Sequence, residues 1–132
     1  MEPLTPAVFD ILLALGDGER HGYAIMREVL QSSGRPMGPG TLYGSLKRML
    51  EAGLIEECGE REDSELNEER RRYYRLTAQG RLAAVGEAER LEGLVRTARS
   101  KALIGTGLSA LHATGSGSLL HAPSYHYGEA PR

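Results

Sequence analysis

Between Pro39 and Gly53 the sequence places four large apolar side chains on one side of a predicted helix. A fold that contains this helix must bury that side and leave the opposite side exposed. With Leu42 set at zero and about 100° per residue, the other three fall within about 80° of it. The four are Leu42, Leu46, Met49 and Leu50. The remaining circumference carries small and basic residues, namely Thr41, Gly44, Lys47 and Arg48. The pattern predicts a helix with one buried face and one small, basic outer face.

Two shorter helices are predicted ahead of this segment. Thr5 is a good N-cap and is followed by Pro6, which suits a first helical position. Apolar residues at helical spacing then continue until Gly16 and Gly18. A second apolar pattern runs from about residue 22 to 32 and meets Gly34, a residue typical of helix C-termini.

Two strands are predicted after the third helix, over residues 54–58 and 71–76. The segment between them, residues 59–70, is polar and holds six acidic residues. In the second strand Tyr74 shares a face with Leu76, so we expect Tyr74 to face the core and Tyr73 to face outward. An isolated hairpin is marginally stable, so it must pack against the helices.

Residues 78–104 are rich in Ala, Leu, Arg and Glu and predict one long helix that Thr77 caps. Its apolar residues recur at three- and four-residue steps. They include Leu82, Val85, Leu91, Leu94, Val95 and Ala98. Little else in the chain is apolar enough to cover this stripe, so a second copy of the chain is its natural cover.

The predicted fold is therefore mainly α with a small antiparallel β-hairpin. The order of three helices and a hairpin is that of a winged helix-turn-helix, here at residues 5–77, followed by a dimerisation helix at 78–104. Residues 105–132 are Gly- and Ser-rich and are predicted to form a flexible tail.

Composition excludes several classes of protein. One cysteine, Cys58, cannot form an internal disulfide or a Cys-rich zinc site. The N-terminus lacks the basic start of a secretory signal, and no stretch is apolar enough for a membrane span, so we expect a cytoplasmic protein. Phosphate-binding glycine loops and nucleophile–base pairs are absent, so we expect no enzyme, no cofactor and no metal.

Three local motifs occur in order: His21-Gly22-Tyr23, then Gly40-Thr41-Leu42-Tyr43, then Tyr74-x-Leu76-Thr77 with Gly80. Over about residues 7 to 104 the chain resembles the PadR family of bacterial transcriptional regulators. The resemblance implies a homodimeric winged-helix repressor that binds a palindromic operator in double-stranded DNA. It also implies a small-molecule effector, because some relatives respond to phenolic acids or other flat hydrophobic molecules. The chain has no Trp, which excludes a pocket built on stacked tryptophans.

Together with the helical pattern, the resemblance nominates residues of the third helix for DNA contact. They are Thr41, Tyr43, Gly44, Lys47 and Arg48. Many relatives have proline where this chain has Gly44, which would let the backbone approach DNA closely. Thr41 is alternatively a helix N-cap, Tyr43 a core residue with its hydroxyl at the rim, Lys47 a solvated surface residue and Arg48 a partner of Glu51.

The hairpin adds Arg71 and Arg72, which could reach the minor groove or its phosphates. Alternatively, the arginines and glutamates of the hairpin neutralise one another. Residues 1–77 carry ten Lys and Arg but fourteen Asp and Glu, a balance of −4. That balance predicts weak binding to bulk DNA. It also keeps open a second function, a winged-helix module that binds another protein through its acidic hairpin.

Overall fold

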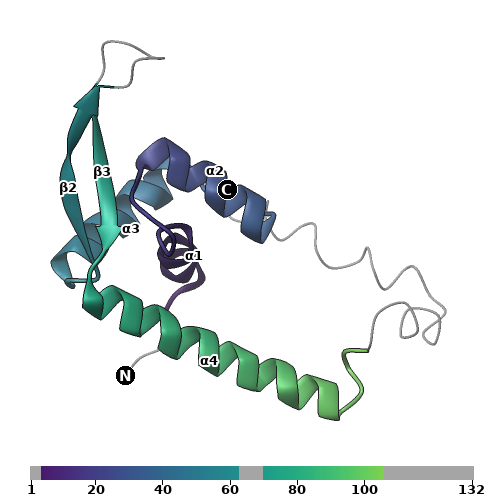
Figure 1. Cartoon of the computed structure of the whole chain (residues 1–132). Helices are drawn as coiled ribbons and strands as arrows, with labels where there is room; N and C mark the ends of the chain where they lie inside the picture. Colours follow the sequence, from purple (N-terminus) through teal and green to yellow (C-terminus); the bar gives the residue numbers. More distant parts are fainter. Residues whose placement is uncertain (1–3, 63–69, 106–132) are drawn as a thin grey trace. The chain divides into compact units, whose positions relative to one another are not determined.

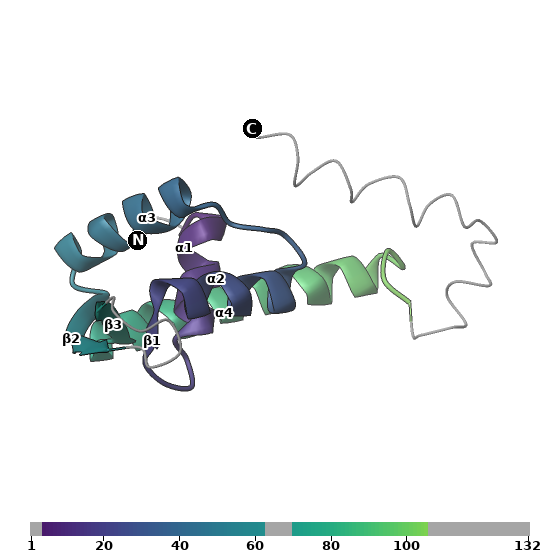
Figure 2. The same cartoon turned by 90° about the horizontal axis from the view of Figure 1, so that it is seen from above.

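The computed structural model describes residues 4–62 and 70–105, and it divides after Glu87 into two units. Figure 1 labels its helices and longer strands, and Figure 2 also labels the short strand β1. The elements follow one another along the chain. They are α1 (Pro6–Ala14), β1 (Arg20–His21), α2 (Gly22–Ser33), α3 (Pro39–Glu51), β2 (Ile55–Glu62), β3 (Arg70–Leu76) and α4 (Ala78–Ser100). The mainly helical winged-helix fold predicted from the sequence is confirmed. The predicted tail beyond residue 105 and the acidic tip of the hairpin lie outside the described residues.

The predicted starts of α1 and α2 are confirmed. The Thr5 hydroxyl accepts a hydrogen bond from the Val8 amide at 3.2 Å, with Pro6 in the first helical position. α2 begins behind His21, whose Nδ1 accepts from the Ala24 amide at 3.2 Å. It ends at Gly34, which adopts a left-handed φ of 75°. The Thr5 and His21 side chains pair with amides that a helix N-terminus leaves without partners. The left-handed Gly34 lets its own amide pair with a carbonyl at the C-terminus of α2.

The sheet has three strands in the order β1-β3-β2, one more than the sequence predicts. In β1, Arg20 pairs with Tyr74 and His21 with Tyr73. Two residues are too few to show an alternating pattern, so this strand leaves no signal in the sequence. Figure 1 shows β2 and β3 extending together away from the helices, and in Figure 2 β1 leads directly into α2.

The hairpin is longer than predicted on its first side. β2 continues to Glu62, where the sequence indicates an end at Cys58. The register between β2 and β3 shifts between Glu57 and Glu60, and Gly59 there has a φ of 120°. A bulge of this kind interrupts the alternation that a sequence pattern detects.

The core gathers α1, α2, α3 and the base of the sheet. From α3, Leu42, Leu46 and Met49 are almost fully buried, as predicted, while Leu50 is only partly buried. Ser45 is also buried, because it lies on the same side of the helix between these residues. Tyr74 is buried at the sheet, which confirms its inward direction. The other buried apolar residues are Ile11, Leu12, Ala14, Leu15, Ile25, Val29 and Ile55.

α4 begins where Thr77 caps it. The Thr77 hydroxyl accepts from the Gly80 amide at 3.0 Å and donates to the Gly53 carbonyl at 2.6 Å. The helix ends at Ser100, four residues before the predicted end, and Ala102 follows with a positive φ of 61°.

Candidate nucleic-acid interface

The outer face of α3 is open. Thr41, Lys47 and Arg48 are all exposed, opposite the buried residues of the same helix. The N-cap of α3 is Gly38, which makes no side-chain capping bond, so the alternative prediction of Thr41 as the N-cap is wrong. Thr41 is instead the third residue of the helix. No ion pair joins Arg48 to Glu51 within the described residues, so that alternative is not what the structure contains.

Tyr43 connects α3 to the start of α2. Its side chain is 51 % exposed, and its hydroxyl lies directly over Gly22. A Cβ on Gly22 would collide with the Tyr43 hydroxyl and would also crowd Leu42 at 3.3 Å. Gly22 therefore allows close packing between the start of α2 and α3. Tyr43 combines packing along one edge with an exposed ring on the other.

Gly44 is open toward solvent. A Cβ built there would meet only the Arg48 Nη1 atom, at 3.7 Å. A larger residue would therefore fit at position 44 without a clash among the described residues. With glycine there, no side chain covers the backbone of α3 at this point.

The arginines of the hairpin differ from one another in their surroundings. Arg72 lies 3.5 Å from Glu57 and Arg75 lies 2.8 Å from Glu56, both across the β2–β3 pair. These contacts correspond to the mutually neutralising alternative for Arg72. They also mean that Glu56 and Glu57 do not form a bare acidic surface. The hydrogen bond and charge of Glu56 raise the pKa of Arg75, which stays a cation.

Arg71 lies on the other side of β3 and approaches α2. Its guanidinium is 5.9 Å from the centre of the Tyr23 ring. Tyr73, on the same side of the strand, packs edge-on against the His21 ring at 5.3 Å. The wing and the first turn of α2 are therefore in direct contact.

Sequence reasoning missed Tyr23 and Arg27. Tyr23 is 51 % exposed, its ring is stacked near His21, and the Arg27 guanidinium lies 5.2 Å from its centre. One signal was present in the sequence, because the two residues are four apart and so share a helix face. The contact with Arg71 could not be read from the sequence, since it joins segments far apart in the chain.

The apolar residues predicted for dimerisation are largely uncovered within each unit. In the first unit Leu82 is 72 % exposed, and Val85 is also exposed. In the second unit Leu94 is 55 % exposed and Val95 is exposed, while Leu91 and Ala98 are half-buried. Neighbouring exposed apolar residues, such as Leu82 with Val85 and Leu94 with Val95, are typical of a surface that contacts another molecule.

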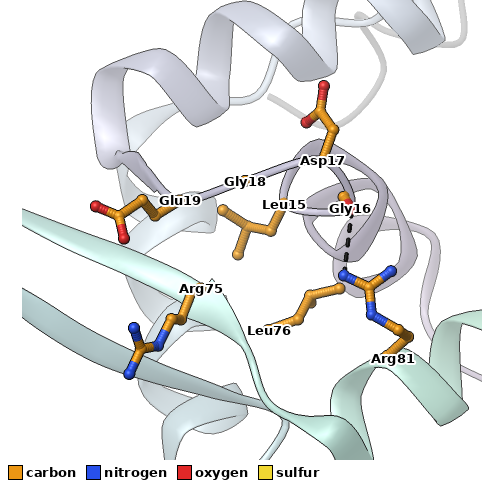
Figure 3. Close-up of a pocket in the computed structure, with 8 residues that line it drawn as sticks. All are labelled: Leu15, Gly16, Asp17, Gly18, Glu19, Arg75, Leu76 and Arg81. Carbon is orange, nitrogen blue, oxygen red and sulfur yellow. Dashed lines mark hydrogen bonds between the residues drawn. The ribbon is translucent and has the colours of Figure 1, made fainter.

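A hollow lies beside the loop that follows α1, and Figure 3 shows its lining residues. Half of the eight are charged: Asp17, Glu19, Arg75 and Arg81. Arg81 donates to the Gly16 carbonyl at 3.2 Å, and the neighbouring Cys58 thiol donates to Glu19 at 3.5 Å. So polar a lining does not suit a flat hydrophobic ligand.

The described part of the chain offers neither a candidate membrane span nor a candidate metal site. Within residues 4–62 and 70–105, no helix combines the length and hydropathy that a membrane span requires. Over the same residues, His, Cys, Asp and Glu side chains form no group of three or more that could hold a metal ion.

Comparison with known proteins gives a consistent result. The family model described as the transcriptional regulator PadR-like family matches residues 11–85. A crystal structure of a PadR family transcription regulator from Clostridium difficile is 26 % identical, with a TM-score of 0.63, and the match covers 73 % of this chain and 97 % of that one.

Two other relatives match less of their own length. An uncharacterised 37.1 kDa protein in transposon TN4556 of Streptomyces fradiae is 40 % identical over 88 residues, 64 % of this chain and 24 % of that protein. This chain thus spans about a quarter of that relative. Bacillus subtilis PadR, crystallised in complex with operator DNA, is 22 % identical with a TM-score of 0.56, covering 64 % of this chain and 47 % of that one. At this identity the likeness concerns the fold.

Proposed function

The chain belongs to the PadR-like family of transcriptional regulators, and from this premise we propose that it is a dimeric, sequence-specific DNA-binding repressor. The observation that carries the proposal is the two-sided character of α3. One side is fixed in the core by Leu42, Leu46 and Met49, and the other presents Thr41, Lys47 and Arg48 to solvent.

α3 has the dimensions of a recognition helix. Its 13 residues make a rod about 20 Å long, and the major groove is about 12 Å wide. Residues near the N-terminus of such a helix contact base edges, which assigns that role to Thr41 and the exposed ring edge of Tyr43. Lys47 reaches guanine or a phosphate, and Arg48 a phosphate. Gly44 allows the backbone between them to approach closely.

The wing contributes less than its arginine content suggests. Arg72 is already opposite Glu57, so a phosphate contact by Arg72 must compete with that carboxylate. Arg71 approaches Tyr23 of α2 instead. Because few cations are left over, we expect weak binding to bulk DNA and specificity that depends on base contacts.

The exposed apolar residues of α4 support assembly as a homodimer. Burying one leucine is worth about 1.5–3 kcal/mol, so a second copy that covers Leu82 and Leu94 offers a substantial gain. Two copies would present two α3 helices, which fit successive major grooves of a palindromic operator when they are about 34–36 Å apart. A small hydrophobic effector would release DNA by changing that spacing. The polar hollow of Figure 3 is not the site we propose for it.

The proposal is tested by a gel shift with DNA from upstream of the chain's own gene. We expect the intact protein to shift this fragment and to leave a scrambled fragment unshifted at physiological salt. The double variant Lys47→Ala/Arg48→Ala should lose the shift, while Glu89→Ala, on exposed α4 surface, should keep it. If the wild-type protein shifts no genomic fragment, the DNA-binding function is wrong.

A further inference from the structure

The first turn of α2 carries a cluster of cations and aromatic rings that the function above does not use. Tyr23 is at its centre and is half exposed. The guanidinium of Arg27 lies 5.2 Å from the Tyr23 ring centre and that of Arg71 lies 5.9 Å from it. The His21 ring is stacked at 6.5 Å with an interplanar angle of 16°. Two elements, α2 and β3, thus bring two positive charges to one exposed tyrosine.

Several arginines of the first unit are paired with carboxylates by the fold itself. Four of them lie 2.8–3.6 Å from a carboxylate oxygen. They are Arg20, Arg35, Arg72 and Arg75. Arg27 is different, because no carboxylate of the described residues pairs with it and its one recorded contact is the Tyr23 ring. Lys47 and Arg48 on α3 also have no carboxylate partner among the described residues.

Two contacts connect the first turn of α2 with α3 and with the wing. Tyr43 of α3 lies over Gly22, the residue before Tyr23. The Arg71 guanidinium of the wing lies 5.9 Å from the centre of the Tyr23 ring. The Tyr23–Arg27 pair therefore lies close to both α3 and β3 of the wing. A DNA duplex whose major groove holds α3 would pass close to Tyr23 and Arg27. In helix-turn-helix proteins the helix before the recognition helix crosses the DNA backbone, and here that helix is α2.

We propose that the Tyr23–Arg27 pair binds the phosphate backbone of the duplex beside the groove that α3 enters. Arg27 neutralises one phosphate through a charge-assisted hydrogen bond, and the Tyr23 hydroxyl donates to the same phosphate or its neighbour. The Tyr23 ring holds the guanidinium in position through its π face. This inference rests on the proposed DNA-binding function and names an additional contact for it.

The test measures binding of the intact protein to labelled operator and to scrambled DNA over a range of salt concentrations. A phosphate contact contributes about 0.9 to the slope of log K against log salt. Arg27→Gln should therefore lower the slope by about 0.9 for each protomer and weaken binding to both DNAs by a similar factor. Arg27→Lys keeps the charge and should keep the slope. Tyr23→Phe should weaken binding while the slope stays at the wild-type value.

Arg96→Gln is the matched control, because it removes the same charge from an exposed arginine of α4. Its slope should equal that of the wild-type protein. If Arg27→Gln has the slope of Arg96→Gln while the wild-type protein binds its operator, this inference is wrong and the proposed function stands. If Arg27→Lys loses as much slope as Arg27→Gln, the contact is not made through charge and the inference also fails. If the wild-type protein binds no DNA, both fail together.

Discussion

Replacing Gly80 with alanine would drive a methyl group into the backbone of Leu54. A Cβ at this position would lie 2.9 Å from the Leu54 carbonyl carbon and closer still to its oxygen. The obstacle is main chain, so it cannot move aside as a flexible side chain would. The same carbonyl oxygen accepts the Thr77 amide at 3.1 Å, and the Thr77 hydroxyl donates to Gly53 at 2.6 Å. The start of α4 can retreat only by breaking these two bonds.

The change in the free energy of unfolding is the sum of one stabilising and two destabilising contributions. Alanine is favoured over glycine within a helix by about 1 kcal/mol. Overpacking of a buried site costs about 1–3 kcal/mol, and each lost hydrogen bond about 0.5–1.5 kcal/mol. We therefore expect Gly80→Ala to lower the free energy of unfolding by about 1–5 kcal/mol.

Gly86 offers a matched control in the same helix. It is exposed, and a Cβ there would meet nothing within 4 Å. Gly86→Ala should raise the stability by up to about 1 kcal/mol through helix propensity alone. Urea unfolding followed by circular dichroism, at one protein concentration for all variants, measures both changes. Equal stability of the two variants would refute the close approach of α4 to Leu54.

Three further predictions concern the core, one titrating group and α4. Ser45→Ala should stabilise the fold by about 1 kcal/mol in thermal unfolding, because the buried Ser45 hydroxyl has no hydrogen-bond partner among the described residues; a loss of stability would contradict this. Burial raises the pKa of Asp10 and outweighs Arg35, which lies 3.6 Å away and lowers it. The folded state therefore holds the Asp10 proton more tightly, so stability is lost as pH rises from the ordinary carboxyl pKa through the raised one. Asp10→Asn should remove this loss of stability from the stability–pH curve. An unchanged curve would contradict the raised pKa of Asp10 in the folded state. Leu94→Lys should reduce the light-scattering mass from twice 14.4 kDa to 14.4 kDa, whereas a wild-type mass of one chain would contradict the dimer.

Helical periodicity was enough to orient α3 from the sequence. Leu42, Leu46 and Met49 are buried because a spacing of three and four residues leaves no other arrangement for a half-buried helix. The same geometry buries Ser45, although its polarity argues against it. Periodicity reports which side of a helix is covered, and the small size of serine lets it stay there.

Pairing between distant segments was beyond the sequence. Arg72 faces Glu57 only because of the β2–β3 register, which a bulge shifts. Arg71 reaches Tyr23 only because β1 joins β3 and leads into α2. The number of cations could be counted in advance, but which of them the fold neutralises could not.

The cross-strand pairs of the wing bear on how such a regulator would search a chromosome. Because Arg72 and Arg75 already pair with glutamates, they contribute little attraction to the phosphates of non-specific DNA. A DNA-binding protein with few spare cations dissociates quickly from the millions of competing sites in a genome. Fewer of its molecules are then sequestered, and a small number of copies per cell suffices to keep one operator occupied.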